Sequence, residues 1–177
     1  IARPLAFIGA RACDLAGMAI QDKILMEDCY IDPFYKERRE KFFVIAVNCN
    51  RCSENCFCVS TGDGPKATKF FDISLSEVDS GFILEIGTQK GNGIVTQLNL
   101  PKAEQKQINK VEMNINNVVK QQTKKLPSVN LRDLLFANLD HPRWDNVAGR
   151  CLSCTNCTQV CPTCFCQCAT ENPNLKG

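Results

Sequence analysis

The sequence lacks any apolar run long enough to cross a membrane. A spanning helix needs about 20 consecutive apolar residues, and the hydrophobic stretches here are short and separated by polar residues. The chain also shows no basic segment followed by an apolar core and a small-residue cleavage site, which is the pattern of a secretory signal. We therefore expect a cytoplasmic protein without a membrane partner.

The chain also has no large excess of positive or negative charge, and it has little histidine. The chain has 21 Lys and Arg residues against 19 Asp and Glu residues, which gives a net charge of +2. Nucleic-acid binders concentrate positive charge on one face, so this balance predicts no nucleic-acid partner. His141 is the single histidine, and the sequence contains neither a Ser/His/Asp set nor a Cys/His nucleophile set. We therefore expect no catalytic residues and no substrate chemistry by this chain alone.

A dinucleotide-binding fingerprint is missing as well. Residues 87–93 contain three glycines, but not in the G-x-G-x-x-G order that follows a strand and begins a helix. Gly62-Asp63-Gly64-Pro65 lacks the strand-to-helix setting of a phosphate-binding loop, so we interpret it as a turn. The sequence therefore predicts no NAD or FAD fold within this chain.

Cysteine, in contrast, is abundant, with 13 residues. An odd number does not fit a closed set of disulfides, and so many thiols indicate metal ligands in a reducing compartment. The densest run is Cys151-Leu-Ser-Cys154-Thr-Asn-Cys157-Thr-Gln-Val-Cys161-Pro162. Its C-x2-C-x2-C-x3-C-P spacing is that of bacterial ferredoxins and predicts a 4Fe-4S cluster. Structural zinc and disulfides are the alternatives. The expected ligands are Cys151, Cys154, Cys157 and Cys161.

The fourth ligand of this cluster is open. In two-cluster ferredoxins the Cys before Pro binds the other cluster, so Cys161 need not complete the set. No second four-Cys run follows it. Either one of Cys164, Cys166 and Cys168 completes the set, or the partner half lies outside these 177 residues.

A second group of thiols follows two expected strands. Residues 5–10 and 42–47 are apolar runs typical of buried strands, and the helical pattern of residues 11–26 predicts a parallel βαβ unit. One thiol then follows the first strand at a helix N-terminus, which favours thiolate, and the second strand leads into a loop with four more. The expected ligands of a second cluster are Cys13, Cys49, Cys56 and Cys58. Zinc is the alternative metal at this irregular spacing.

The sequence also predicts the roles or locations of four other residues. Cys52 is the substitute if one of the four expected ligands is structural. Cys29 stands alone and is expected to be a core or surface thiol. His141 is expected to cap a helix or to lie at the surface. Trp144 precedes the C-terminal cysteines, and we expect it to pack over that cluster and exclude water.

The rest of the chain predicts further helices and a hairpin. Asp32-Pro33 is a preferred helix start, and residues 70–76 and 81–87 predict a β-hairpin. Apolar residues at three- and four-residue spacing between 101 and 125 predict an amphipathic helix with a lysine-rich outer face, closed by Pro127. They are Ile108, Val111, Ile115, Val118 and Val119. A short helix capped by Asn130 is expected next.

These elements predict an α+β fold. A small α/β region with a Cys-rich loop is followed by an α-helical, ferredoxin-like iron-sulfur module. We expect three parts, namely an α/β domain over residues 1–100, a helical connector over 101–130 and the 4Fe-4S module over 131–177.

Five separated motifs, in one order, resemble a known family. They are Arg11-Ala-Cys13-Asp14-Leu15; Asp32-Pro33-Phe34-Tyr35 with Glu37-Arg38-Arg39-Glu40; Cys49 with Cys56-Phe57-Cys58 and Gly62-Asp63-Gly64-Pro65; His141-Pro142-Arg143-Trp144; and the run from Arg150 to Cys166. Together they are similar to the 4Fe-4S dicluster subunit found as the beta subunit of NAD(P)-linked nickel-iron sulfhydrogenases and as the A subunit of anaerobic sulfite reductase.

This resemblance implies a relay of electrons between a flavin- and NAD(P)-binding subunit and a catalytic subunit, which is a hydrogenase or a sulfite or sulfur reductase. It implies one or two 4Fe-4S clusters in this chain. It also implies a region before Ile1 and a second ferredoxin half-motif after Gly177. Cys29, Cys52 and Cys168 depart from the family pattern.

Two other functions remain open at this point. In the first, both groups of cysteines bind zinc, and the lysine-rich helix binds a partner in a module without redox activity. In the second, Cys164, Cys166 and Cys168 form reversible disulfides in a thiol-based redox sensor.

Overall fold

The computed structural model describes residues 3–79, 81–161, 163 and 164. The chain divides into two compact units, Ile1–Leu139 and Asp140–Gly177, and each is described by itself. The predicted mixture of helices and a sheet is confirmed. The ferredoxin-like arrangement of the C-terminal part stays a prediction.

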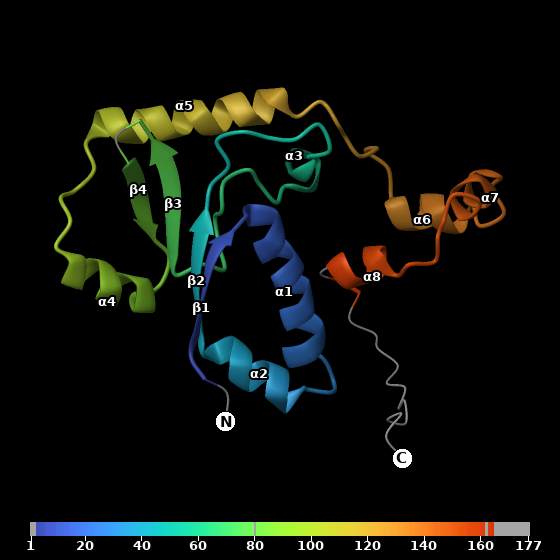
Figure 1. The fold of residues 1–177 in the computed structure, drawn as a ribbon, viewed down its shortest axis with the longest axis horizontal. Coiled ribbons are helices and arrows are strands. Elements are labelled where there is room, and N and C mark those ends of the chain that lie inside the picture. Colours follow the sequence, from blue (N-terminus) through green and yellow to red (C-terminus); the bar gives the residue numbers. More distant parts are fainter. Residues whose placement is uncertain (1–2, 80, 162, 165–177) are drawn as a thin grey trace, which may run out of the picture. The chain divides into compact units, whose positions relative to one another are not determined.

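The first unit is built on a four-stranded sheet with the order β1-β2-β3-β4 (Figure 1). The strands are β1 Leu5–Ala10, β2 Phe42–Val47, β3 Ile73–Val78 and β4 Gly81–Ile86. Strands β1, β2 and β3 run parallel to one another, and β4 runs antiparallel to β3. The predicted parallel βαβ unit and the predicted hairpin are therefore confirmed.

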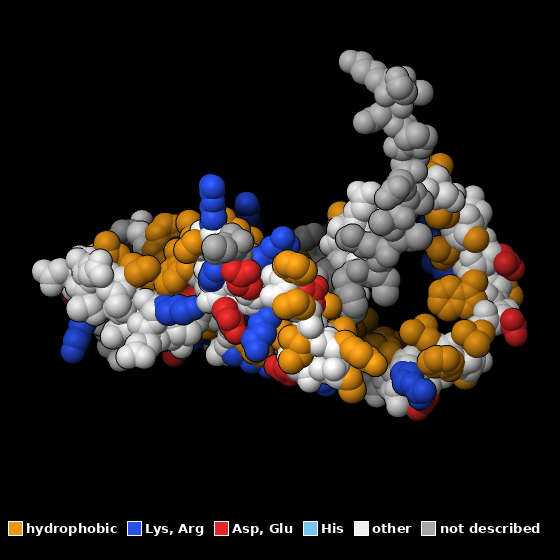
Figure 2. Space-filling view, turned by 90° about the horizontal axis from the view of Figure 1, so that it is seen from below, with side chains coloured by type: hydrophobic (Ala, Val, Ile, Leu, Met, Phe, Trp, Pro, Cys, Tyr) orange, Lys and Arg blue, Asp and Glu red, His pale blue; other side chains and the backbone are white. Residues whose placement is uncertain are grey.

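Strand β2 lies inside the sheet because its sequence, FFVIAV, suits burial on both faces. Val44 and Ala46 are among the most buried side chains and pack with Leu15 and Phe71 in the core. Strands β1 and β4 form the edges, and large apolar side chains on both are exposed. Figure 2 shows hydrophobic and charged side chains interspersed on the face that it draws.

Helices α1 Ala12–Met26 and α2 Pro33–Glu40 connect β1 to β2, as the sequence predicts. The carboxylate of Asp14 accepts the backbone N–H of Arg11 at 2.8 Å and so closes the first turn of α1. Asp32 caps α2 by accepting the N–H groups of Phe34 and Tyr35. The two start signals read from the sequence are thus present as hydrogen bonds.

Helix α4 Gln89–Leu98 was not expected from the sequence, because Gly91 and Gly93 interrupt its pattern. Thr88 caps this helix by accepting the N–H of Gly91 at 3.2 Å. A side chain at position 91 would overlap the backbone carbonyl group of Asp72. The glycine therefore permits α4 to lie close to the start of β3.

Helix α5 Gln105–Gln121 is the predicted amphipathic helix. It packs on β3 and β4, and its Val111 and Val118 are buried. It ends at Gln121, well before Pro127, because the chain turns to extended backbone at Gln122. The second compact unit begins at Asp140. The division into an α/β domain, a connector and a 4Fe-4S module stays a prediction.

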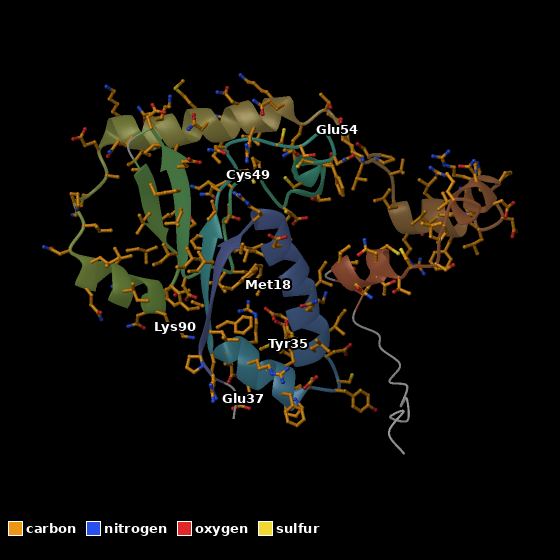
Figure 3. The ribbon with its side chains drawn as sticks, in the orientation of Figure 1. Met18, Tyr35, Glu37, Cys49, Glu54 and Lys90 are labelled. Atoms are coloured by element: carbon orange, nitrogen blue, oxygen red, sulfur yellow. The ribbon has the colours of Figure 1, made fainter. Side chains whose placement is uncertain are left out.

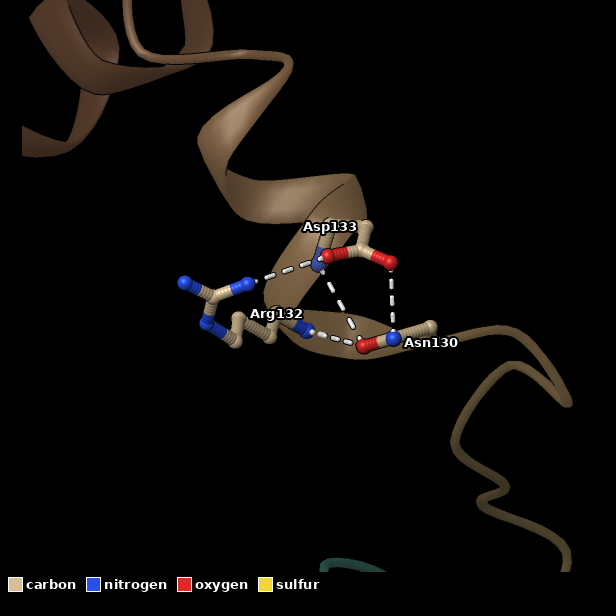
Figure 4. Close-up of polar contacts among 3 residues, drawn as sticks. All are labelled: Asn130, Arg132 and Asp133. Atoms are coloured by element: carbon tan, nitrogen blue, oxygen red, sulfur yellow. Dashed lines mark hydrogen bonds and ion pairs between the residues drawn. The ribbon is translucent and has the colours of Figure 1, made fainter.

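Helix α6 Leu131–Phe136 is the short helix predicted after Asn130. The side-chain oxygen of Asn130 accepts the N–H groups of Arg132 and Asp133, at 3.1 and 3.3 Å (Figure 4). Its amide nitrogen donates to the Asp133 carboxylate at 2.7 Å. The first turn of α6 is therefore held by its capping residue.

In the second unit, the helices among the described residues are α7 Arg143–Ala148 and α8 Asn156–Val160. The described side chains of this unit are almost all exposed, so packing contributes little to holding it together. Within the described parts of both units, no helix has the length and apolar character needed to traverse a bilayer.

Candidate metal centres

The first candidate site lies where β1 and β2 end. Parallel strands bring their carboxyl ends to the same edge of a sheet. Cys13 stands in the first turn of α1, just after β1, and Cys49 follows β2 (Figure 3). The pairing of β1 with β2 shifts register at Gly9, whose φ of 97° marks a bulge that redirects the chain before Cys13.

The structure brings the four expected ligands together. The thiol of Cys13 interacts electrostatically with those of Cys49 and Cys58. The thiol of Cys49 interacts with those of Cys56 and Cys58. This neighbourhood joins the end of one strand, the end of the next strand and the Cys-rich loop. The assignment of these four residues as ligands stays a prediction.

Burial is the main influence on the protonation of this group. It raises the pKa of Cys13, and the Asp14 carboxylate and the neighbouring thiols Cys58 and Cys49 raise it further. Burial also raises the pKa of Cys49, although the Arg11 guanidinium opposes that effect. The protonated form of Cys13 and Cys49 is therefore favoured, and a bound cation favours the thiolate form that a ligand needs.

Arg11 holds the end of β2 beside the thiols. Its Nη1 donates to the backbone carbonyl oxygens of Val47 at 3.1 Å and Asn48 at 3.4 Å. The side chain also forms a hydrogen bond with Cys49. In the sequence, Arg11 stands out only as part of the family motif, and its hydrogen bonds to the end of β2 and to Cys49 could not be predicted from it.

The Cys-rich loop is held by its own backbone and by the end of α5. The thiol sulfur of Cys56 accepts the N–H of Ser53 at 3.3 Å. Cys58 begins the short helix α3 Cys58–Thr61, and its sulfur accepts Nε2–H of Gln122 at 3.2 Å. Gln122 lies 64 residues after Cys58, so no local sequence signal could have found it.

The donor set fits a four-iron cluster. All four donors are thiols, the ligand type of such clusters. A Cβ atom at position 64 would lie 2.9 Å from Sγ of Cys58 and 3.3 Å from Cβ of Ala12, so the loop approaches closely where Gly64 has no side chain.

A single metal ion and a four-iron cluster require different spacings of their ligand side chains. Among the described residues, no three His, Cys, Asp or Glu side chains are grouped so that they could hold one metal ion. A zinc ion needs all its sulfur ligands about 2.3 Å from a single centre. A four-iron cluster instead binds each of its four thiolates through a different iron.

Two further cysteines of the first unit lie differently. Cys52 is half-buried, and its thiol donates to Oε1 of Gln121 at 3.7 Å. Cys29 is exposed, which agrees with the surface alternative for this residue. Neither thiol is among those that influence Cys13 or Cys49.

The second candidate site is the ferredoxin-type run in the second unit. Ser153 and Thr155, on either side of Cys154, have positive φ values of 52° and 60°. Left-handed residues alternating with ordinary ones turn backbone N–H groups inward, which forms the concave nests that bind anions and iron-sulfur clusters. The N–H of Ser153 already donates to the sulfur of Cys151 at 3.4 Å. The backbone geometry therefore suits a cluster with negative charge.

Cys161 has a separate environment. Hydrogen bonds from Thr163, whose hydroxyl lies 3.1 Å from the sulfur, lower the pKa of Cys161 to about 7, and the side chain of Cys164 adds to this effect. The N–H of Cys164 also donates to the Cys161 carbonyl at 3.2 Å. Cys166 and Cys168 lie outside the described residues. The choice of a fourth ligand therefore stays open.

The single histidine caps a helix, as predicted. Nδ1 of His141 accepts the backbone N–H of Arg143 at 3.1 Å, at the start of α7. Trp144 is about half exposed, and its expected place over the cluster is a prediction that stays untested.

Within the first unit, a groove of about 630 Å³ lies at the start of β2 and β3. Its lining includes Asp72 and Lys90, the latter labelled in Figure 3. The Asp72 carboxylate accepts from Val44 and Thr88, and Nζ of Lys90 donates to the carbonyl of Glu40. These polar groups are satisfied within the protein, so the groove is not assigned a ligand.

The two groups of thiols define an iron-sulfur electron-transfer protein, and the comparisons with known proteins agree. The family model for the 4Fe-4S dicluster domain matches residues 45–165, which is more than half of the chain. The chain therefore belongs to the 4Fe-4S dicluster domain family and binds 4Fe-4S clusters.

The sulfhydrogenase 2 beta subunit of Pyrococcus furiosus is similar along the chain. It is 32% identical over 160 residues, which cover 89% of this chain and 47% of the relative. The chain thus spans about half the length of this curated relative. No solved structure matches the chain.

Proposed function

We propose that this chain relays electrons between a flavin- and NAD(P)-binding subunit and a catalytic subunit of a cytoplasmic oxidoreductase complex. The catalytic subunit is a hydrogenase or a sulfite or sulfur reductase. The relative is by its name a subunit of a sulfhydrogenase, and this supports the assignment of the chain to a complex of that kind.

The observation that carries the proposal is the convergence of thiols from distant parts of the chain. Four cysteines meet at the carboxyl ends of β1 and β2, and a separate ferredoxin-type run follows in the second unit. The proposed ligands of the first cluster are Cys13, Cys49, Cys56 and Cys58. Those of the second are Cys151, Cys154, Cys157 and Cys161.

A bound cluster supplies reversible uptake and release of one electron without bond chemistry on a substrate. The protein groups set the conditions for that exchange. The N–H groups of Ser53 and Ser153 donate to the thiolates of Cys56 and Cys151, and Arg11 places positive charge beside Cys49. Such donors and charges stabilise the added electron and so raise the potential.

The test of the proposed cofactor content is an absorption spectrum of the complete protein, purified anaerobically, with iron and acid-labile sulfide assayed in the same sample. Two clusters predict a broad band near 400 nm and about eight iron and eight sulfide per chain. A colourless protein that contains zinc contradicts the proposal and favours the zinc-binding module.

The relay role has its own test. NAD(P)H is added to the anaerobic protein with and without a purified flavin-containing subunit of the same complex, and bleaching near 400 nm is followed. We expect reduction only when the flavin subunit is present, because this chain has no dinucleotide fingerprint. Equal reduction by NAD(P)H without that subunit contradicts the relay.

A further inference from the structure

The segment that follows α5 forms a strap over the Cys-rich loop. Residues 121–126 contact residues 52–60 at five points along this short stretch. The contacts are Cys52 Sγ to Gln121 Oε1 at 3.7 Å, Gln122 Nε2 to Cys58 Sγ at 3.2 Å, Val59 N–H to Gln122 Oε1 at 3.2 Å, Lys124 Nζ to Asn55 Oδ1 at 3.2 Å and Leu126 N–H to Ser60 Oγ at 3.3 Å.

Gln122 is the buried member of this strap, with 7% of its surface exposed. Its amide oxygen accepts the backbone N–H of Val59, which donates only. This contact fixes the orientation of the amide, so that Nε2 faces the sulfur of Cys58. A buried amide group held in this way is already ordered. Cluster binding therefore costs it little further conformational freedom.

The state of Cys58 decides the direction of the contact. A protonated thiol can donate to the amide oxygen of Gln122, which lies 3.6 Å away. A metal-bound thiolate has no proton and can only accept, which leaves the shorter contact from Nε2–H at 3.2 Å. Both contacts are present in the structure, and the one from Nε2–H is the one that remains when Cys58 is a ligand.

We propose that Gln122 is a positioning residue that raises the reduction potential of the N-terminal 4Fe-4S cluster through its N–H donation to the Cys58 thiolate. The inference rests on the proposed function, since it requires a cluster with Cys58 as a ligand. In the redox step, one electron enters the oxidised cluster from the flavin subunit and no proton moves on Gln122. Reduction makes the sulfur ligands more negative, so a fixed donor stabilises the reduced state more than the oxidised state.

The test replaces Gln122 within the complete protein. A background with Cys154→Ser and Cys157→Ser removes the C-terminal cluster, so that a single signal is titrated. Gln122→Met keeps the length of the side chain but removes the donor. Gln122→Glu keeps the acceptor for Val59 and places a carboxylate beside the thiolate. Gln121→Glu is the matched control, because it adds the same charge one residue earlier, on an exposed side chain without contact to Cys58.

The measurement is a reductive titration followed by electron paramagnetic resonance. We expect Gln122→Met to make reduction about tenfold less favourable, which is about 59 mV for a one-electron couple. Gln122→Glu should shift the potential further in the same direction, and Gln121→Glu should shift it least. Unchanged potentials in both Gln122 variants with full iron content overturn the role of Gln122 and leave the proposed electron-transfer function intact.

A second measurement tests the same contact without the Gln122 variants, in case these variants lose the cluster. In the background protein with 15N-labelled glutamine side chains, pulsed electron paramagnetic resonance of the reduced cluster should show a nitrogen coupling that Gln121→Glu retains. Absence of that coupling overturns the proposal. A background protein without any cluster, in which Cys13, Cys49, Cys56 and Cys58 are intact, contradicts the proposed ligand set itself.

Discussion

At the scale of single residues, the close approach at Gly64 makes a sharp prediction. Gly64→Ala places a Cβ atom 2.9 Å from Sγ of Cys58, so this thiol must move away from the other three. Overpacking of this kind costs about 1–3 kcal/mol of folding free energy. We expect the iron of the N-terminal cluster to be lost or strongly reduced, as measured by iron content per chain.

Gly93→Ala is the control for that prediction. A Cβ atom at position 93 meets no other atom within 4 Å, and the residue lies inside α4. Alanine is favoured over glycine inside a helix by about 1 kcal/mol, so this variant should be slightly more stable and keep its iron. Equal iron contents in Gly64→Ala and the wild type would show that Cys58 is not a ligand.

The fourth ligand of the C-terminal cluster can be decided by a pair of substitutions. The ferredoxin spacing favours Cys161, whose sulfur also lies 3.1 Å from the Thr163 hydroxyl. We therefore expect Cys161→Ser to remove or convert this cluster and Cys164→Ser to leave its resonance spectrum unchanged. The reverse result assigns the fourth position to Cys164.

At the scale of elements, local signals predicted the structure well and distant contacts did not appear in the sequence pattern. The Asp32 carboxylate acts within one helical turn, so Asp32-Pro33 was sufficient to predict where α2 begins. Helix α4 was missed because its glycines serve a close approach to β3. The chain folds α5 against the sheet.

In the candidate metal sites, too, local signals could be predicted from the sequence and distant contacts could not. Cys13 and Cys49 were grouped correctly in space because strand pairing could be predicted from apolar runs. Gln122 reaches Cys58 across 64 residues, and nothing in its neighbours distinguishes it from the other glutamines of that segment.

The junction of α1 with α2 predicts a pH dependence of stability. The hydroxyl of Tyr35 donates to Asp22 at 2.8 Å, and Arg39 pairs with the same carboxylate at 2.9 Å. Burial, and then this carboxylate, raise the pKa of Tyr35 above its usual value. The folded state thus keeps a proton that the unfolded chain releases near pH 10, so the stabilisation is present below about pH 10 and is lost as the pH rises further.

Tyr35→Phe should therefore reduce the fall of unfolding free energy above pH 10, and it should cost about 1 kcal/mol near neutral pH for the lost hydrogen bond. Urea unfolding at several pH values measures both effects. Tyr30→Phe is the control, since the side chain of Tyr30 is almost fully exposed. An unchanged slope in Tyr35→Phe would show that Tyr35 does not carry the effect.

At the scale of the whole molecule, the two groups of cysteines belong to separate compact units. The described side chains of the second unit are mostly exposed, so we expect its order to depend on the cluster. Cys154→Ser should lower the iron content from about eight to about four per chain and leave the thermal unfolding of the first unit unchanged. Calorimetry with an iron assay measures both quantities, and a large loss of stability in the first unit contradicts the independence of the two units.

The strap also has a consequence for how the protein is made. Cys13 leaves the ribosome more than a hundred residues before Gln122, and the β strands that gather the first three thiol-bearing segments are complete earlier than the strap. A cluster inserted at that early stage would lack the Gln122 contact, because residues 121–126 would not yet lie on the Cys-rich loop. The hydrogen bond from Gln122 to Cys58 therefore becomes available only after helix α5 has been synthesised.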